Sequence, residues 1–534
     1  MKHSESFWVA ILGILVGILL TLTFNTIKSR KHSVNVKYDD WRKLNLVLDE
    51  VEKNYVDTID KEGVTDAAIE AALAKLDPHS IYLPPAKLED SETALAGNFD
   101  GIGIQFNVPN DTAIVLEVIP GGPSEKIGLQ AGDRIIKVED KVIAGVKFPQ
   151  DSMVRLMKGP AGTKVNITIQ RQGTSIPFEI TRGKIPVHSV DAYFMLNDTT
   201  GYIRLSKFAR TTSKEFIEAS QKLLAEGMNR LIFDLRDNSG GYFDQAFNLC
   251  DAFLKKGDEV VYMQGLHKKK ENYTADGHGI LQDVELSVLI NESSASSSEI
   301  FAGAIQDNDR GVIVGRRSYG KGLVQEPIYF SDGSGIRLTV ARFYTPSGRC
   351  IQKPYSSEED YQYDIYRRYE GGEMLDADSI KVDKSLQYHT KGGRIVYGGG
   401  GIIPDIFVPI DTTKATKFYL NSNKKATPMR FASEMFDKYR DTLGQIDNFE
   451  DLNNFFESVS LETQFRSFAE RVDGLKASEK EWADTKEYLL PQLRALVGRY
   501  SKLGENAFYK LYTSIDQTIL KAIESSSKVK LDEN

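Results

Sequence analysis

Short apolar strand patterns alternate with helical patterns between residues 185 and 352, and this alternation restricts the fold more than any other feature. LIFDLR precedes the helical pattern YFDQAFNLCDAFL, and VELSVLI precedes EIFAGAIQ. In such a pattern each helix carries the chain back across a sheet to the next strand. The sequence therefore predicts an α/β core.

The other segments predict further domains, because 534 residues are too many for one hydrophobic core. A helical pattern covers residues 33–97, and β-branched runs separated by Gly and Pro predict a small β-rich domain over 98–184. We expect the α/β core to span 185–410, with a tyrosine-rich insertion at 353–398. Residues 411–534 are helical in pattern, so the predicted fold class is multidomain α/β.

Residues 7–27, FWVAILGILVGILLTLTFNTI, contain no charged side chain. As a helix this segment would be roughly 30 Å long, enough to cross the hydrocarbon core of a bilayer. A cleaved signal has a shorter apolar part and a small-x-small site, so we expect residues 1–32 to be a transmembrane anchor rather than a signal. Three basic residues follow the segment, and by the positive-inside rule they would keep the body in the cytoplasm.

The composition excludes several classes of function. A net charge of −8 gives no general basic surface, so the sequence predicts no nucleic-acid partner. Cys250 and Cys350 are the two cysteines, and they form neither a CxxC pattern nor a disulfide framework. The seven histidines include no HExxH pair. A zinc hydrolase of that type is therefore not indicated, and we expect no metal and no cofactor.

The β-rich domain opens with GIGIQF, residues 101–106. Glycines before a strand let consecutive backbone N–H groups turn toward one point, which suits a carboxylate. With the AGDRI turn at residues 131–135, this segment resembles a PDZ domain. Such domains bind a peptide's C-terminus as an added strand. The resemblance places the peptide at Gly101, Ile102, Gly103 and Ile104.

The serine-rich stretch NESSASSSEIFAGAIQ lies between a strand pattern and a helical pattern, so it is a turn rather than a linker. Ser296 and Glu299 fit the S-x-x-E capping box, which is the simpler interpretation. A helix start also gathers unpaired N–H groups, however, and these can stabilise an oxyanion. The turn alone leaves capping and catalysis open.

A glycine-bracketed loop, GVIVGRRSYGKGLVQ, presents Lys321, with Gln325 four residues later. A lysine activates a serine only when its amine is neutral, which requires its pKa to fall by about 3 units from 10.4. Burial in an apolar pocket has that effect. The plain alternative is a solvated surface lysine.

The order of motifs decides between these alternatives. The PDZ-like segment is followed by FDLRDNSGG, SSASSSEIFAGAIQDN, SYGKGLVQ, ARFYTPSGR and GIIPDIFVP. Over residues 40–410 this order resembles the C-terminal processing peptidases, PDZ-containing serine proteases with a Ser–Lys dyad and a crotonase-like core. LDPHSIYLP, residues 76–84, is similar to the segment that precedes the PDZ domain in that family.

The resemblance implies a nucleophile, a base and a group that supports the base. These are Ser296, Lys321 and Gln325, with an oxyanion hole from the backbone of Gly240 or Gly241 and of Ser297. Ser297 replaces the small apolar residue that is usual in the family, and Asp307 occupies an acidic position with a structural role. Lys158 matches a basic residue linked to control of the protease by the PDZ domain.

We therefore expect a membrane-anchored serine endopeptidase that binds unstructured, apolar C-terminal tails of envelope proteins. The family works in bacterial envelopes, which places the catalytic body outside the cytoplasmic membrane, against the charge count. An adaptor protein and a homo-oligomer stay open.

Three alternatives remain. One is an inactive membrane-anchored PDZ scaffold, and another is a crotonase-like protein that binds acyl thioesters. The third is a Ser–His–Asp site, although the histidines at 188, 267, 278 and 389 lie outside the segments that the family uses.

Overall fold

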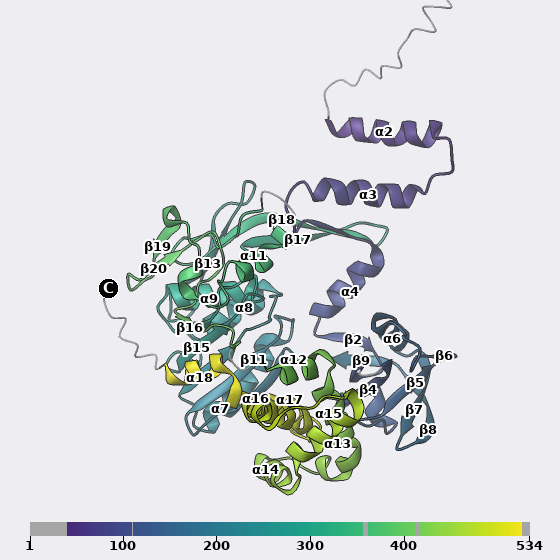
Figure 1. Ribbon diagram of the computed structural model, residues 1–534. Coiled ribbons are helices and arrows are strands. Elements are labelled where there is room, and N and C mark those ends of the chain that lie inside the picture. Colours follow the sequence, from purple (N-terminus) through teal and green to yellow (C-terminus); the bar gives the residue numbers. More distant parts are fainter. Residues whose placement is uncertain (1–39, 109–110, 356–360, 413–415, 526–534) are drawn as a thin grey trace, which may run out of the picture. The chain divides into compact units, whose positions relative to one another are not determined.

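The computed structural model describes residues 40–108, 111–355, 361–412 and 416–525 (Figure 1). The chain divides into two compact units, residues 1–72 and 73–534. The first contains helix α2 (Asp40–Asn54) and all but the last residue of α3 (Lys61–Leu73).

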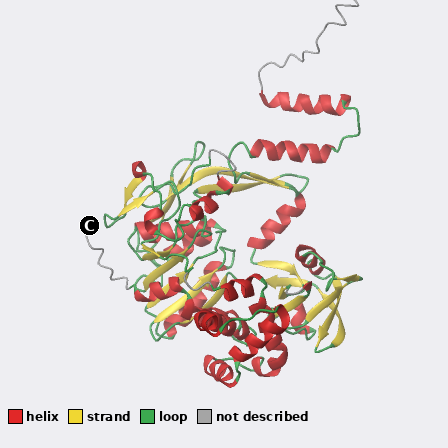
Figure 2. Cartoon of the chain, viewed as in Figure 1, coloured by secondary structure: helices red, strands yellow, loops and turns green. Residues whose placement is uncertain are grey.

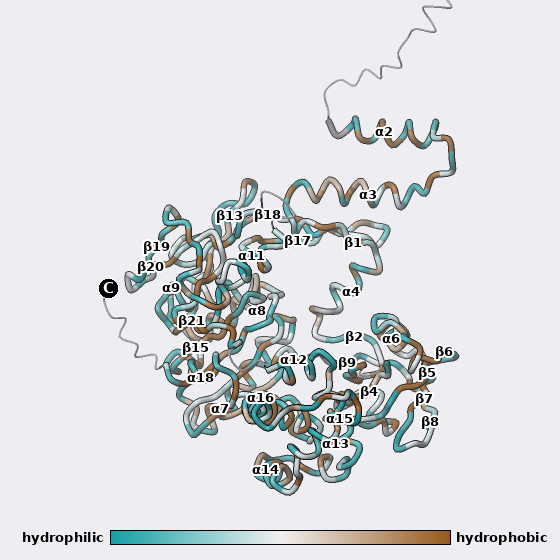
Figure 3. The backbone as a smooth tube through the Cα atoms, in the orientation of Figure 1, coloured by the Kyte–Doolittle hydropathy of each residue, from teal (hydrophilic) through white to brown (hydrophobic). Residues whose placement is uncertain are grey.

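The expected fold class included an N-terminal transmembrane helix, and this part of the expectation is corrected by the structure. Its residues, 7–27, lie outside the described residues. Within the part of the chain that the structure describes, no helix is both long enough and apolar enough to cross a membrane. Helices α2 and α3 mix hydrophilic and hydrophobic residues along their whole length (Figure 3).

The PDZ-like domain is a small antiparallel sheet with two short helices, α5 (Pro123–Lys126) and α6 (Gln150–Met157). Its strands are β2 (Asn98–Gly101), β3 (Ile104–Asn107), β4 (Ala113–Val118), β5 (Arg134–Val138), β6 (Lys141–Val142), β7 (Lys164–Arg171), β8 (Thr174–Thr181) and β9 (Gly183–Pro186). The sheet order is β3-β4-β5-β7-β8, β6 pairs with β5, and β2 pairs with β9. Strand β3 is therefore an edge strand of its sheet.

The α/β core is a largely parallel sheet in the order β10-β11-β12-β15-β16-β21, in which only β10 runs antiparallel to its neighbour. Helices α7 (Thr212–Ala225), α8 (Phe243–Asp251) and α9 (Ser297–Asp307) connect its strands. The strands are β10 (Val190–Met195), β11 (Thr200–Leu205), β12 (Arg230–Asp234), β15 (Glu285–Ile290), β16 (Val312–Gly315) and β21 (Ile406–Phe407). The predicted α/β core is confirmed.

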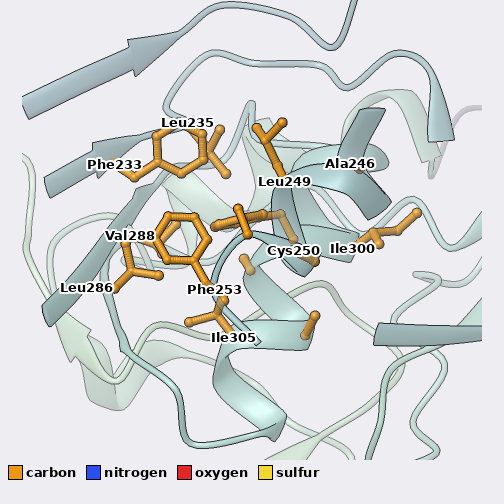
Figure 4. Close-up of a cluster of buried hydrophobic side chains, with 14 of the residues drawn as sticks. Phe233, Leu235, Ala246, Leu249, Cys250, Phe253, Leu286, Val288, Ile300 and Ile305 are labelled. Carbon is orange, nitrogen blue, oxygen red and sulfur yellow. The ribbon is translucent and has the colours of Figure 1, made fainter. Parts of the chain in front are cut away.

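The hydrophobic core of this sheet explains why its strands read as continuous apolar runs. Five consecutive residues of β15 are buried, as expected for a strand covered on both faces. Figure 4 shows side chains from β12 and β15, Phe233 and Val288 among them, packing against α8 and α9. Cys250 lies in this core, and both cysteines are free.

A second sheet has the order β1-β18-β13-β14, with β17 also paired to β18. Its strands are β1 (Ile81–Leu83), β13 (Glu259–Gln264), β14 (Glu271–Thr274), β17 (Leu323–Tyr329) and β18 (Gly335–Tyr344). Strand β1 precedes the PDZ-like domain in the chain, yet it pairs with β18 of the protease region. Helix α4 (Pro85–Leu95) then leads from β1 to β2.

The remaining elements are the insertion and the C-terminal helices. The insertion contains α11 (Asp364–Glu370) and the hairpin of β19 (Gln387–His389) and β20 (Ile395–Tyr397). Described residues 416–525 contain helices and no strand (Figure 2). These are α12 (Lys417–Lys424), α13 (Thr427–Leu443), α14 (Phe449–Ser458), α15 (Leu461–Asp473), α16 (Glu479–Gly498), α17 (Glu505–Tyr512) and α18 (Gln517–Glu524). The domain boundaries drawn from sequence stay predictions.

Candidate active site

Ser296 lies at the start of α9, in the turn that follows β15. Its backbone has a φ of 55°, a region that non-glycine residues seldom adopt. Such a conformation persists only where the surrounding contacts fix it, and it occurs often at functional sites. The turn therefore holds Ser296 in an unusual geometry.

The other serines of the turn are occupied. The hydroxyl of Ser294 donates to Leu235 O at 2.8 Å, and that of Ser298 donates to Asn238 O at 2.9 Å. The hydroxyl of Ser297 donates to Gly241 O at 3.0 Å. Ser296 and the exposed Ser293 are the serines of this turn whose hydroxyls donate to no described residue.

A single carboxylate joins the serine turn to the lysine loop. Glu299 Oε2 accepts from the backbone N–H of Ser296 at 2.9 Å and from that of Lys321 at 2.8 Å. Its Oε1 accepts from the N–H of Gly320 at 2.7 Å and from the hydroxyl of Ser318. Burial raises the pKa of Glu299, while these four hydrogen bonds act in the opposite direction. The predicted capping glutamate thus fixes both candidate catalytic residues.

Lys321 is half-buried, and its Nζ donates to Gln325 Oε1 at 2.9 Å. Burial lowers its pKa, and the nearby cation of Arg337 lowers it further. The carboxylates of Glu299 and Asp77 act against this shift without reversing it. The direction is the one that a lysine base requires.

The glycine pair after β12 contributes one free backbone amide. The N–H of Gly240 donates to Asn238 Oδ1 at 2.9 Å, so it is engaged. The N–H groups of Gly241 and Ser297 donate to no other described residue. Gly241 has a φ of 147°, and a Cβ there would lie 2.1 Å from Phe208 O, so only glycine fits. Gly241 and Ser297 are the amides available to an oxyanion.

These residues share one cavity of about 850 Å³. Ser296, Lys321, Gln325 and the glycine pair line it. Most of the remaining wall is apolar and comes from α4, α8, β17, β18 and the insertion, through Leu88, Leu95, Phe243, Leu323, Val324, Phe343 and Ile365. The structure therefore brings the predicted serine, lysine and glutamine together.

Three residues at the cavity escaped the sequence analysis. Asn238 holds the Gly240 amide, and Arg337 faces Lys321. The third is His79, whose Nε2 lies 2.6 Å from the hydroxyl of Tyr361. Burial lowers the pKa of His79 to about 4. Its motif, LDPHS, was visible in the sequence but suggested no role.

Other predicted residues lie elsewhere. Asp307 is buried and pairs with Arg349 at 2.7 Å, which suits a structural role. None of the four histidines weighed as an alternative base lines the cavity. The described residues also contain no cluster of three or more His, Cys, Asp or Glu side chains placed to hold a metal ion.

The predicted peptide-binding residues run from the last residue of β2 to the first residue of the edge strand β3. Gly103 has a φ of 79°, and a Cβ there would lie 3.0 Å from the side chain of Ile185. Ile102 is buried and its carbonyl accepts from the hydroxyl of Ser124 at 2.6 Å. Lys158 follows α6, and its Nζ lies 5.4 Å from the ring centre of Phe99 in β2.

Two segments of the chain match known protein families, and most of the chain is similar to known proteins. Residues 101–181 match the PDZ domain family, and residues 199–363 match peptidase family S41. The chain is 34% identical over 376 residues to the carboxy-terminal-processing protease of Bartonella bacilliformis, covering 68% of this chain and 83% of that protein. The chain belongs to the carboxy-terminal processing protease family.

As a member of this family, the chain is a serine-type endopeptidase with a PDZ domain. It is also 30% identical over 356 residues to the carboxy-terminal processing protease CtpA of Bacillus subtilis, covering 66% of this chain and 76% of that protein. The solved photosystem II D1 C-terminal processing protease is 27% identical, with a TM-score of 0.38, over 70% of this chain and 87% of that chain.

Proposed function

We propose that this carboxy-terminal processing protease cleaves polypeptides near their C-termini with Ser296 as nucleophile and Lys321 as general base. The observation that carries the proposal is the pair of hydrogen bonds from the backbone of Ser296 and of Lys321 to one oxygen of Glu299. Because both backbones bind the same oxygen, the two residues have fixed positions relative to each other, and both line the one cavity.

The choice of Ser296 over its neighbour rests on hydrogen bonding. The hydroxyl of Ser297 is buried and donates to Gly241 O, so it would have to break that bond to react. The hydroxyl of Ser296 has no such partner among the described residues and lines the cavity. Ser293 also lines the cavity with an unengaged hydroxyl, but it is Ser296 whose backbone N–H shares an oxygen of Glu299 with that of Lys321.

The chemistry follows from these positions. Neutral Lys321 accepts the proton of Ser296 as its Oγ attacks the peptide carbonyl, and the amides of Gly241 and Ser297 stabilise the oxyanion. Lys321 then protonates the leaving amine, and water releases the acyl group from Ser296. Gln325 holds the amine through its Oε1.

The substrate is an unstructured polypeptide with an apolar C-terminus. Strand β3 is an edge strand, so a peptide can add to it as a further strand, with its carboxylate at the N–H groups of residues 101–104. The apolar wall of the catalytic cavity suits apolar side chains near the cleaved bond.

The experiment compares the full chain with Ser296→Ala, Ser297→Ala and Lys321→Ala on an unfolded protein that ends in an apolar tail. We expect Ser296→Ala and Lys321→Ala to lose at least about a thousandfold in kcat/KM, whereas Ser297→Ala retains activity. Cleavage that survives Ser296→Ala but not Ser297→Ala would move the nucleophile. Cleavage that survives Lys321→Ala would refute the dyad.

Lys158 is proposed to link the PDZ domain to activity. It directly follows α6, its backbone lies close to Gly101, and its Nζ lies over Phe99 of β2. Helix α4, which precedes β2 in the chain, lines the catalytic cavity. The test is the rate of cleavage of an internal substrate with and without an added apolar C-terminal peptide. Lys158→Ala should lose the response to the peptide, and an unchanged response would refute the link.

The site of action is proposed to be the bacterial envelope, outside the cytoplasm, as in the family that the motifs resemble. An adaptor protein and self-association belong to the same proposal. Cell fractionation with protease shaving of spheroplasts tests the location. A chain that stays protected inside intact spheroplasts would contradict it.

A further inference from the structure

The short turn Asp77–Ser80 lies against the catalytic lysine loop, although it precedes the PDZ domain in the sequence. Its backbone meets Gln325, because the Nε2 of Gln325 donates to the carbonyl of His79. The other end of the Gln325 amide, Oε1, accepts from Lys321 Nζ at 2.9 Å. One amide group therefore connects the turn to the lysine.

The carbonyl of His79 fixes which end of the amide faces the lysine. A backbone carbonyl can only accept a hydrogen bond, so the NH₂ end of Gln325 must face His79 and the oxygen must face Lys321. If the amide were reversed, its N–H would donate to the lone pair of a neutral Lys321. The lone pair that must take the serine proton would then be occupied.

Asp77 builds the turn. Its Oδ1 accepts from the N–H of His79 at 2.8 Å and from that of Ser80 at 2.9 Å. Its Oδ2 accepts from the hydroxyl of Ser80 at 2.6 Å. Asp77 is buried, with 7% of its surface exposed. Removing its carboxylate would therefore leave the N–H groups of His79 and Ser80 without an acceptor. The carboxylate thus determines where the His79 carbonyl points.

The turn and Gln325 are attached to the same residue of β18. The hydroxyl of Thr339 donates to Asp77 Oδ1 at 3.1 Å, and its N–H donates to Ser80 Oγ at 3.1 Å. Thr339 is also the cross-strand partner of Gln325, next to a register shift at which β18 has one more residue, Val340, than β17. Thr339 therefore fixes the position of the turn relative to Gln325.

The insertion holds the turn from its other side. Tyr361 lies beside the His79 ring, with ring centres 5.3 Å apart, and its hydroxyl lies 2.6 Å from His79 Nε2. A residue of the insertion therefore limits movement of the turn.

We infer that Asp77 is a positioning residue for catalysis, acting through the His79 carbonyl and Gln325 to hold Lys321 with its lone pair free. This inference rests on the proposed Ser–Lys dyad. It gives the LDPHS motif a role in the orientation of the base.

The charged groups that face Lys321 set how the pH profile must be interpreted. Arg337 on β18 lowers the pKa of Lys321, whereas Glu299 on α9 and Asp77 in the turn raise it. His79 is neutral at the pH of the assay because its pKa is about 4. A change at Asp77 therefore removes a charge as well as hydrogen bonds, and two substitutions are needed to separate these effects.

The experiment measures kcat and KM from pH 5 to pH 10 for the full chain and for Asp77→Ala and Asp77→Asn. Asp77→Ala loses every acceptor, so we expect kcat to fall about 10- to 100-fold at unchanged KM. Asp77→Asn keeps an acceptor at Oδ1, so kcat should return to within about threefold, with the acidic limb at lower pH because a charge that favours protonated Lys321 is gone.

Asp332→Ala is the matched control. Asp332 accepts from the N–H and the hydroxyl of Ser334 in a turn before β18, as Asp77 does with Ser80, but it does not line the cavity. This variant should keep kcat. If Asp77→Ala does not fold, Ser80→Ala removes only the hydroxyl that joins Asp77 to Thr339, and it should lower kcat severalfold at unchanged KM.

The outcomes separate this inference from the proposed function. Activity in Ser296→Ala or Lys321→Ala would refute the dyad itself. With the dyad intact, a wild-type kcat in Asp77→Ala, or in Ser80→Ala where it is needed, would overturn the positioning role alone. A kcat in Asp77→Asn as low as in Asp77→Ala would also overturn it, since the acceptor would then be insufficient.

Discussion

A half-buried lysine, Lys321, and a buried one, Lys353, lie on neighbouring segments of this protein, and their surroundings differ. The N–H of Lys353 donates to the carbonyl of Gly320 at 2.9 Å, so Lys353 is adjacent to the loop that carries Lys321. Burial lowers the pKa of both amines. Their partners differ, and the partners decide what each amine can do.

Lys353 has the surroundings of a permanent cation. Its Nζ lies 3.1 Å from Asp364 Oδ2 and sits over the rings of Tyr319 and Tyr361, at 4.0 and 4.2 Å from their centres. Carboxylates and aromatic faces both favour the ammonium form. Lys353 does not line the catalytic cavity.

Lys321 has the surroundings of a base. Its bonded partner is the neutral amide of Gln325, and the charge beside it with the greatest effect is the cation of Arg337. The carboxylate with the greatest effect on it, Glu299, already accepts four hydrogen bonds from other groups. Burial lowers the pKa of both amines, but only Lys321 has no carboxylate bonded directly to its amine among the contacts described. We therefore expect Lys321, and not Lys353, to act as a base.

The largest expected effect comes from replacing each lysine by methionine. Lys321→Met should lower kcat/KM by at least about a thousandfold, whereas Lys353→Met should keep it within about tenfold. Proteolysis of an unfolded substrate with an apolar tail measures both. An equal loss of kcat/KM in the two variants would show that the surroundings of the two lysines do not decide which one is the base.

The same substitution predicts a gain in stability. The folded state holds the pKa of Lys321 below its unfolded value, so below the unfolded pKa, near 10.4, the buried amine opposes folding. The penalty is present at neutral pH, shrinks as the pH rises from the folded toward the unfolded pKa, and is absent above about 10.4. Lys321→Met should therefore raise the midpoint of thermal unfolding at pH 7, and a lower midpoint would contradict the penalty.

The next effect comes from giving Lys321 the kind of partner that Lys353 has. Gln325→Glu places a carboxylate against the amine, which favours the protonated form and raises its pKa. We expect kcat at pH 7 to fall about 10- to 100-fold and to recover as the pH rises. Gln325→Ala is the control, because it should lower kcat without moving the acidic limb to higher pH. An acidic limb unchanged in Gln325→Glu would show that Lys321 does not control it.

The sequence predicted those parts of the site that depend on residues close together in the chain. The β15 run of buried residues predicted a strand, and S-x-x-E predicted that Ser296 precedes a helix that contains Glu299. The order of motifs then brought Ser296, Lys321 and Gln325 into one expected site, and they line one cavity. Their roles stay predictions.

Contacts between distant segments escaped the sequence analysis. Gln325 and His79 are 246 residues apart, and nothing in the periodicity of either segment reports that β1 pairs with β18. The hydrogen bonds from the lysine loop to Glu299 were missed for the same reason, because they join segments that are distant in the sequence. Hydrophobic patterns record which face of an element is buried, but they do not record which polar group meets it.

The smallest expected effect concerns Arg337, the cation that lowers the pKa of Lys321. Arg337→Met removes a positive charge, so the pKa of Lys321 should rise and the acidic limb of kcat should move to higher pH. The rate at pH 7 should fall about two- to tenfold, while the rate on the alkaline plateau stays the same.

Arg337→Lys keeps the charge and serves as the control. Because Arg337 is only partly buried, salt screens its field, and the gap between wild type and Arg337→Met should narrow in about 0.5 M salt. A gap that is the same at every salt concentration would assign the effect to packing rather than to charge.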